Sequence, residues 1–134
     1  MSTVPQELNW VKVRSECSVG RVFSQLFIEA EQDVKDINLL PTTPGYPPPT
    51  FAVQQNQAGD FFAVFEAGDT RAVVKFHLGP DRIAISMPDG KQLTITLTLN
   101  NDGVCKLKVD GEGEFERWQV RRRVLESLFF DRFR

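Results

Sequence analysis

The segment Gln92–Leu99, QLTITLTL, alternates apolar and polar side chains without interruption. Its leucines and isoleucine fall on one side of an extended chain, and its threonines fall on the other. Because successive side chains of a β-strand point to opposite faces of a sheet, this alternation predicts a strand with one buried and one hydrated face.

The same period of two recurs in five further segments between residues 50 and 109: Thr50–Gln55, Asp60–Glu66, Arg71–Leu78, Arg82–Met87 and Val104–Val109. Short turn sequences rich in Gly, Asp and Asn separate these segments, and such loops are too short for parallel crossovers. The sequence therefore predicts an antiparallel meander of about six strands over residues 50–109. We expect a curved sheet, with a closed barrel as the alternative.

Helical spacing replaces the alternation on both sides of this region. Apolar residues recur every three or four positions over residues 16–38, which predicts an amphipathic helix that Ser15 or Ser18 caps. Residues 8–14 fit either a strand or a lead-in to this helix. A second apolar stripe predicts a C-terminal helix over residues 114–130, packed on the sheet: Phe115, Trp118, Leu125, Leu128 and Phe129. The predicted fold class is α+β.

The 134 residues suit a single domain, residues 1–134. Residues 41–49 hold five of the eight prolines, which predicts an extended connector between helix and sheet. A ligand for an aromatic groove is the alternative interpretation of this segment.

Two cysteines, Cys17 and Cys105, are too few for a framework of several disulfides. We expect two reduced thiols, one of them in the core, although a single bridge between them is chemically allowed. The chain starts without a signal-peptide pattern, and its longest apolar runs are far too short to span a membrane. These features predict a soluble, cytoplasmic protein.

Side chains that carry out catalysis are scarce. His77 is the only histidine, and the alternation places it on the polar side of a strand, away from both cysteines. No cysteine pair has metal-binding spacing, and no glycine-rich nucleotide fingerprint occurs. We expect no catalytic, metal or cofactor site, and enzymatic activity is disfavoured.

Charge is distributed unevenly along the chain. Residues 117–134 hold six arginines and two acids, whereas the whole chain has a net charge of −2. The C-terminal helix therefore presents an arginine face: Arg117, Arg121, Arg122 and Arg123. These arginines either pair with acids of the first helix or contact an acidic partner protein; nucleic acid is disfavoured because the rest of the chain is acidic.

Eleven phenylalanines exceed what one sheet face and two helix stripes can bury. Phe62 points away from the core face predicted for Phe61, and Phe130 and Phe133 lie outside one narrow stripe. These three need a second cover. We therefore predict a non-enzymatic protein-interaction or regulatory domain that binds another protein or forms a homodimer. The alternative is a binder of an apolar small molecule between curved sheet and helix.

Overall fold

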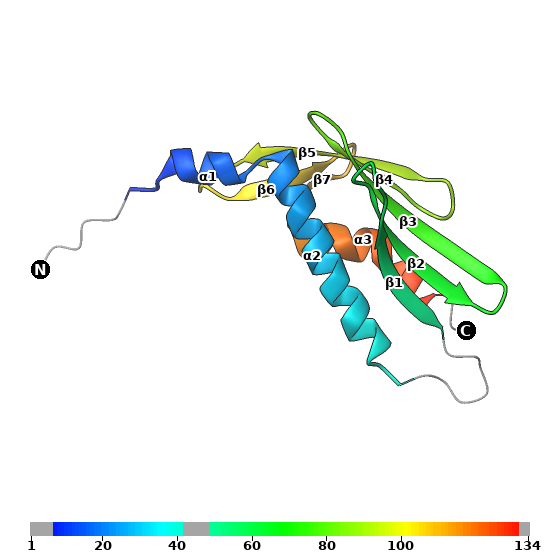
Figure 1. Cartoon of the computed structure of the whole chain (residues 1–134). Helices are drawn as coiled ribbons and strands as arrows, with labels where there is room; N and C mark the ends of the chain where they lie inside the picture. Colours follow the sequence, from blue (N-terminus) through cyan, green and yellow to red (C-terminus); the bar gives the residue numbers. More distant parts are fainter. Residues whose placement is uncertain (1–6, 42–48, 132–134) are drawn as a thin grey trace, which may run out of the picture.

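The computed structural model describes residues 7–41 and 49–131 and confirms an α+β fold (Figure 1). Three helices accompany one sheet: α1 (Trp10–Glu16), α2 (Val19–Asn38) and α3 (Arg117–Phe130). The strands are β1 (Thr50–Gln55), β2 (Phe61–Ala67), β3 (Thr70–Leu78), β4 (Ile83–Ser86), β5 (Gln92–Leu99), β6 (Cys105–Val109) and β7 (Gly113–Phe115). Most of the proline-rich segment 41–49 and all of residues 132–134 lie outside the described residues.

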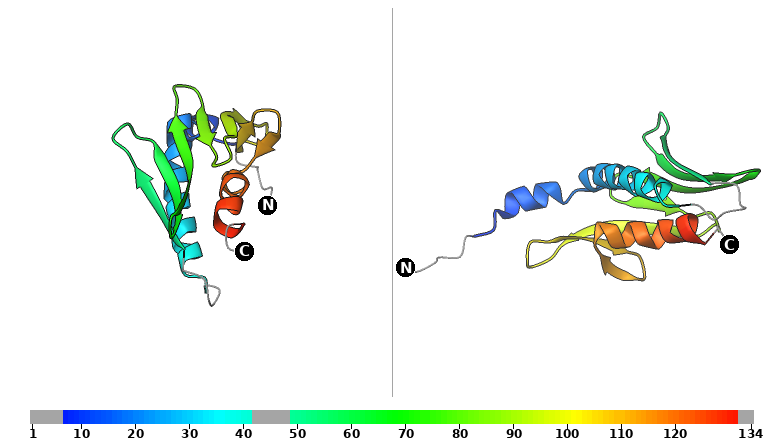
Figure 2. Two further views of the ribbon diagram at one scale, coloured as in Figure 1. Left: turned by 90° about the vertical axis from the view of Figure 1, so that its right-hand side faces the viewer. Right: turned by 90° about the horizontal axis from the view of Figure 1, so that it is seen from below.

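The sheet is an antiparallel meander in the order β1-β2-β3-β4-β5-β6-β7. It has one strand more than predicted, because β7 pairs with β6 where the sequence indicated the start of a helix. The sheet is open rather than barrel-like, since β1 and β7 are its two edges among the described residues. It is curved, and α2 and α3 lie side by side on its inner face (Figure 2).

Phenylalanines of the strands and helices form the centre of the core. The Phe61 and Phe76 rings stack with centroids 4.3 Å apart, and Phe23 of α2 lies 5.0 Å from Phe61. Phe129 of α3 contacts Phe51 of β1 at 5.1 Å. The alternation of the strands is confirmed, because the predicted inward residues of β5, such as Ile95, face this core.

The predicted helix over residues 16–38 corresponds to α2, and a separate short helix, α1, precedes it. The helix α1 ends at Glu16. Ser18 caps the next helix, α2, by accepting a hydrogen bond from the Arg21 backbone N–H. The helix α2 therefore begins three residues later than predicted, with Ser18, one of the two predicted caps, at its start. Residues 8–14, left open as a strand or a lead-in, fall mostly within the helix α1. Seven residues are too few to show a helical period, so the sequence pattern did not distinguish α1 from a strand.

The cysteines form a disulfide bond, which corrects the expectation of two reduced thiols. Cys17, between α1 and α2, is bonded to Cys105 at the start of β6, across 88 residues of sequence. The bond attaches the N-terminal end of α2 to the sheet. Disulfides are typical of oxidising compartments, so the argument for the cytoplasm from reduced thiols does not hold, and that location stays a prediction.

The C-terminal helix begins at Arg117, three residues later than predicted. The Glu116 backbone N–H donates to Gln119 Oε1 at 2.8 Å and closes the first turn. Val120, Leu125 and Leu128 are buried against the sheet and α2, whereas Trp118, predicted in the apolar stripe, is exposed. None of the described helices is long and apolar enough to cross a membrane.

Candidate interaction site

Ion pairs hold α2 and α3 side by side. Arg117 Nε lies 2.7 Å from Glu29 Oε1, and Arg121 Nε lies 2.6 Å from Asp33 Oδ2. Both pairs advance by one helical turn in the same direction along the chain, so the two helices run parallel. For Arg117 and Arg121 the structure thus shows the first of the two alternatives, pairing with acids of the first helix.

Arg121 is the most buried member of this network, with its side chain 14% exposed. Its Nη1 is 3.4 Å from Glu29 Oε1 but makes no hydrogen bond to a described residue. A guanidinium in this position is compensated by two carboxylates, Glu29 and Asp33. Arg121 therefore fixes the distance between α2 and α3 at the point where the apolar groove between them begins.

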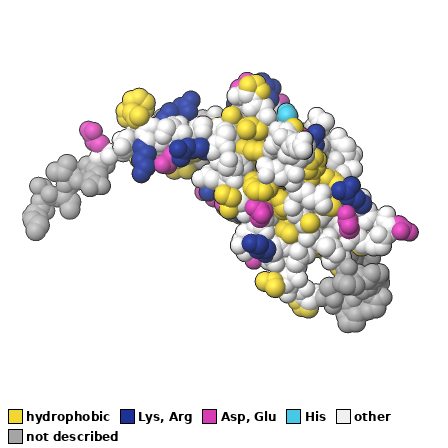
Figure 3. Space-filling model, viewed as in Figure 1, with side chains coloured by type: hydrophobic (Ala, Val, Ile, Leu, Met, Phe, Trp, Pro, Cys, Tyr) yellow, Lys and Arg dark blue, Asp and Glu magenta, His cyan; other side chains and the backbone are white. Residues whose placement is uncertain are grey.

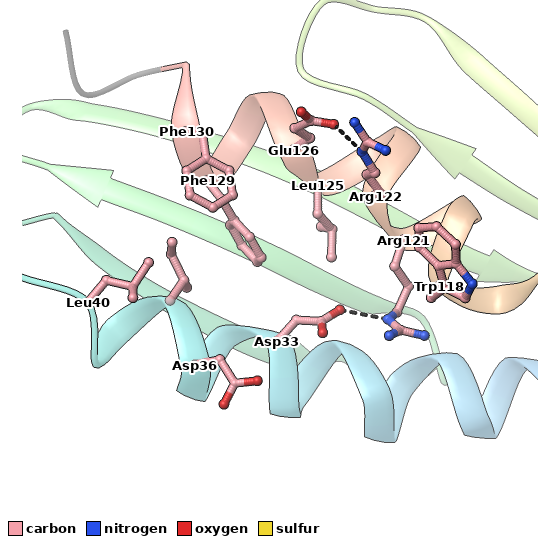
Figure 4. A pocket seen from close by; sticks show the side chains of 11 residues that line it. Asp33, Asp36, Leu40, Trp118, Arg121, Arg122, Leu125, Glu126, Phe129 and Phe130 are labelled. Carbon is pink, nitrogen blue, oxygen red and sulfur yellow. Dashed lines mark hydrogen bonds and ion pairs between the residues drawn. The ribbon is translucent and has the colours of Figure 1, made fainter.

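A groove of about 450 Å³ lies between α2 and α3 beyond this network (Figure 4). Its walls are mainly apolar at the C-terminal ends of the helices, where Leu40 and Phe130 face each other across the opening in Figure 4. Acids and arginines follow its rim. The lining residues are Asp33, Asp36, Ile37, Leu40, Trp118, Arg121, Arg122, Leu125, Glu126, Phe129 and Phe130.

Large apolar side chains of the groove remain in contact with water. Leu40, Trp118 and Phe130 each keep half or more of their surface exposed. Trp118 is held in place at one end, because its indole N–H donates to Glu116 Oε2 at 2.8 Å and lowers the pKa of that carboxyl. Clustered exposed aromatic and aliphatic side chains of this kind are typical of binding surfaces.

The structure gives each predicted contact arginine a partner within the chain. Besides Arg117 and Arg121, Arg122 pairs with Glu126 at 2.9 Å and Arg123 pairs with Glu112 at 3.2 Å. Arg122 and Arg121 also line the groove, whereas Arg117 and Arg123 do not. A contact role for these arginines stays a prediction, and any such partner must compete with the internal carboxylates.

The three phenylalanines singled out in the sequence lie in different places. Phe130 forms one wall of the groove. Phe62 is half-buried on the outer face of the sheet, opposite Gln54 of β1 and Lys75 of β3. Phe133 lies outside the described residues. Phe62 and Phe130 therefore belong to two separate surfaces, and only Phe130 adjoins an apolar groove.

Sequence reasoning missed one polar cluster on the outer face of the sheet. Asp60 is buried, and its Oδ1 lies 2.6 Å from His77 Nδ1. Asn56 Oδ1 accepts the Asp60 backbone N–H at 3.0 Å, and Lys75 Nζ lies 3.6 Å from Asp60 Oδ2. The alternation placed His77 correctly, but no sequence signal indicated that Asp60, 17 residues earlier, meets it.

This cluster stabilises the ionised form of Asp60. The hydrogen bond from His77 is the largest influence and lowers the pKa of Asp60 below its ordinary value near 3.8, while burial opposes the lowering. Asn56 and Lys75 lower the pKa further. Because an ionised carboxylate only accepts hydrogen bonds, Nδ1 of His77 carries the proton. Through Asp60, these contacts join the β1–β2 turn to His77 and Lys75 of β3.

Within residues 7–41 and 49–131, no three His, Cys, Asp or Glu side chains are grouped to hold a metal ion. No protein-family model, curated protein or solved structure matches the chain. The interpretation of the groove therefore depends on its own geometry.

Proposed function

We propose that this chain is a non-enzymatic protein-interaction domain that binds an apolar segment of a protein in the groove between α2 and α3. One observation carries the proposal: Leu40, Trp118 and Phe130 are gathered in one groove and are each at least half exposed. Burying such side chains against a partner is worth roughly 25 cal/mol per Å² of apolar surface. Burial of these three side chains would therefore contribute favourably to the free energy of binding.

The chemistry of the lining supports contact rather than catalysis. The described residues that line the groove include no histidine, cysteine, serine or threonine. Two of its acids, Asp33 and Glu126, are already paired with Arg121 and Arg122. These pairs form a polar rim around an apolar centre, which is the usual arrangement of a protein interface.

The size of the groove supports a second candidate, an apolar small molecule. A volume of about 450 Å³ lies within the range of small-molecule sites, roughly 300–1,000 Å³. Such a molecule would lie between two helices, rather than between sheet and helix as the sequence suggested. Phenylalanines such as Phe61 and Phe76 occupy the space between sheet and helices.

Peptide selection tests the proposal directly. We expect a displayed random peptide library, panned on the immobilised protein, to yield peptides with apolar residues at helical spacing. Their binding should shift the backbone NMR signals of the groove residues. Leu40→Glu combined with Phe130→Glu should weaken binding at least tenfold, because two charges enter the apolar wall.

The control is Leu78→Glu, which changes a partly exposed leucine of β3 that does not line the groove. Its peptide affinity should equal that of the unaltered protein. Peptide signals that map away from the groove would refute the proposal. Binding of a small apolar probe at the groove, without any peptide, would favour the second candidate.

A further inference from the structure

Helix α1 is an arm without a core of its own. None of its residues is buried, and Trp10 and Val11 are 66% and 59% exposed. Figure 3 shows apolar and basic side chains on this projecting part of the molecule. An isolated helix of seven residues is far too short to be stable in water. The structure places the Leu8 side chain, just before the arm, against Gly103 of the β5–β6 turn, whereas Trp10 and Val11 are left exposed for a further surface to cover.

The arm cannot cover the groove of its own chain. The disulfide between Cys17 and Cys105 fixes the arm at the N-terminal end of α2. The exposed end of the groove, at Leu40 and Phe130, lies at the C-terminal end of that helix, whose 20 residues span about 30 Å. Figure 1 shows α1 beside the turn between β5 and β6, far from the C-terminal end of α2.

We propose that a second copy of this chain supplies the missing cover. In a two-fold dimer with antiparallel α2 helices, the arm of each copy packs on the end patch of the other copy, which consists of Leu39, Leu40 and Phe130. This inference rests on the proposed function of the groove and names its occupant. The arrangement is isologous and therefore closes at two copies.

An exposed isoleucine lies where this dimer needs one. Ile28 is 63% exposed and lies at the middle of α2, on the side opposite the buried residues Leu26, Ala30 and Val34. A two-fold axis that crosses α2 at its midpoint places Ile28 against the same residue of the second copy. The same axis brings the N-terminal end of one α2 to the C-terminal end of the other, which is where the arm must lie.

The charges of the arm and the end patch are complementary. Lys12 of the arm follows Val11 and forms no ion pair with a described residue, and Asp36 lies in the last turn of α2, four residues before Leu40. Asp36 accepts a hydrogen bond from Gln32 at 2.9 Å but is likewise without a cation among the described residues. A contact between Lys12 and Asp36 across the interface would flank the apolar surfaces.

The apolar surface area of the arm favours a dimer in which each copy's arm packs on the other copy, rather than one in which a single arm is covered. The exposed surface of Leu8, Trp10 and Val11 amounts to roughly 300 Å² per arm, given that one aromatic residue buries 150–250 Å². Two arms and the surfaces they cover bury roughly 1,200 Å², the lower limit for a stable interface. A single arm buries half of that, which is typical of nonspecific contacts.

Analytical ultracentrifugation of the full chain tests the proposal. We expect a concentration-dependent dimer, and Trp10→Glu should raise its dissociation constant at least tenfold without altering the circular dichroism spectrum. Leu78→Glu, on β3, should leave the dissociation constant unchanged. A chain that remains monomeric at about 1 mM, or a dimer that Trp10→Glu does not weaken, would overturn the inference.

Complementation distinguishes a broken contact from a damaged fold. The variants Trp10→Glu and Leu40→Glu should each fail to dimerise alone, because neither homodimer contains an intact arm and an intact end patch. Mixed together, they retain one intact contact and should associate more tightly than either variant alone. Mixtures that associate no better than the separate variants would overturn the reciprocal arrangement.

Cross-linking locates the two-fold axis. Because Cys17 and Cys105 are bonded to each other, Ile28→Cys adds the only free thiol, and mild oxidation should join two copies through it. Gln54→Cys, on the outer face of β1, is the matched control and should stay uncross-linked. Equal cross-linking of both variants would overturn the antiparallel arrangement. The peptide experiment is independent: groove-binding peptides with a monomeric chain would refute this inference alone.

Discussion

Asp60 is the one charged side chain that is buried among residues 7–41 and 49–131. Its three neighbours come from two different parts of the sheet: Asn56 from the β1–β2 turn, and Lys75 and His77 from β3. A buried carboxylate is costly unless its oxygens are paired and hydrogen-bonded, and here both are. The polar cluster therefore specifies how the turn joins the sheet.

The lowered pKa of Asp60 predicts a loss of stability in acid. Its ionised form is preferred in the folded chain, so its contribution is complete above the ordinary pKa near 3.8 and is lost as the pH falls through the lower folded value. Asp60→Asn should remove this contribution and cost about 2 kcal/mol at pH 7. Urea unfolding between pH 7 and pH 3 measures both effects.

Asp69→Asn, in the exposed turn between β2 and β3, is the control for this measurement. The stability of Asp60→Asn should vary less with pH below 5 than that of the control. If both variants follow the same acid profile as the unaltered chain, the carboxylate of Asp60 does not contribute in the way proposed.

At the scale of the elements, the disulfide attaches α2 to β6. A bridge across 88 residues restricts the unfolded chain strongly, so Cys17→Ser combined with Cys105→Ser should lower the free energy of unfolding by about 3 kcal/mol. Guanidinium denaturation measures the loss. The double variant also avoids a lone reactive thiol.

Thiol titration gives the control for this prediction. The purified protein should contain no free thiol under native conditions, because the described structure has no unpaired cysteine. Adding a reductant should lower the stability of the unaltered chain to that of the double variant. Two free thiols in the native protein, with unchanged stability, would contradict the bond.

The sequence predicted the strands well because each is a local pattern. Alternation and turn residues are sufficient to place β2, β3 and β5, whose bounds differ little from the predicted segments. The strand β7 was missed since its three residues, Gly113–Phe115, are too short to show a period. The helix α1 was left undecided between a strand and a helix lead-in, because its seven residues are too few to show a helical period.

The candidate site was predictable only in part. Phe130 and the arginines could be singled out from excess apolar residues and from charge asymmetry. Their partners could not, because the pairs between α2 and α3 join residues 88 positions apart. Trp118 fitted a helical stripe, yet α3 turns it to the rim of the groove. Contacts between residues so far apart in the sequence, and the orientation of α3 on the sheet, cannot be read from a local period.

The whole molecule depends on how the parallel helices α2 and α3 are joined above the sheet. Phe51 contacts both Phe65 and Phe129 and links β1 and β2 to α3. The polar link between the helices centres on Arg121, which lies between Glu29 and Asp33. The apolar groove opens directly beyond this arginine, so the spacing that Arg121 sets also sets the width of the groove.

Replacing this arginine should therefore affect both stability and binding. Arg121→Met keeps the apolar stem but leaves Asp33 without its cation and Glu29 with Arg117 alone, which should cost about 2 kcal/mol. Arg122→Met is the matched control, because Arg122 is 66% exposed and its pair with Glu126 contributes at most about 0.5 kcal/mol. Thermal unfolding of both variants measures the difference.

A compensated variant separates lost charge balance from lost packing. Adding Asp33→Asn to Arg121→Met removes the uncompensated charge, leaves the Arg117–Glu29 pair intact and should recover most of the lost stability, since a neutral amide is less costly to bury. The affinity of a groove-binding peptide should remain reduced, because the ion pairs of Arg121 that fix the helix spacing are absent. Full recovery of both quantities would show that Arg121 does not set the width of the groove.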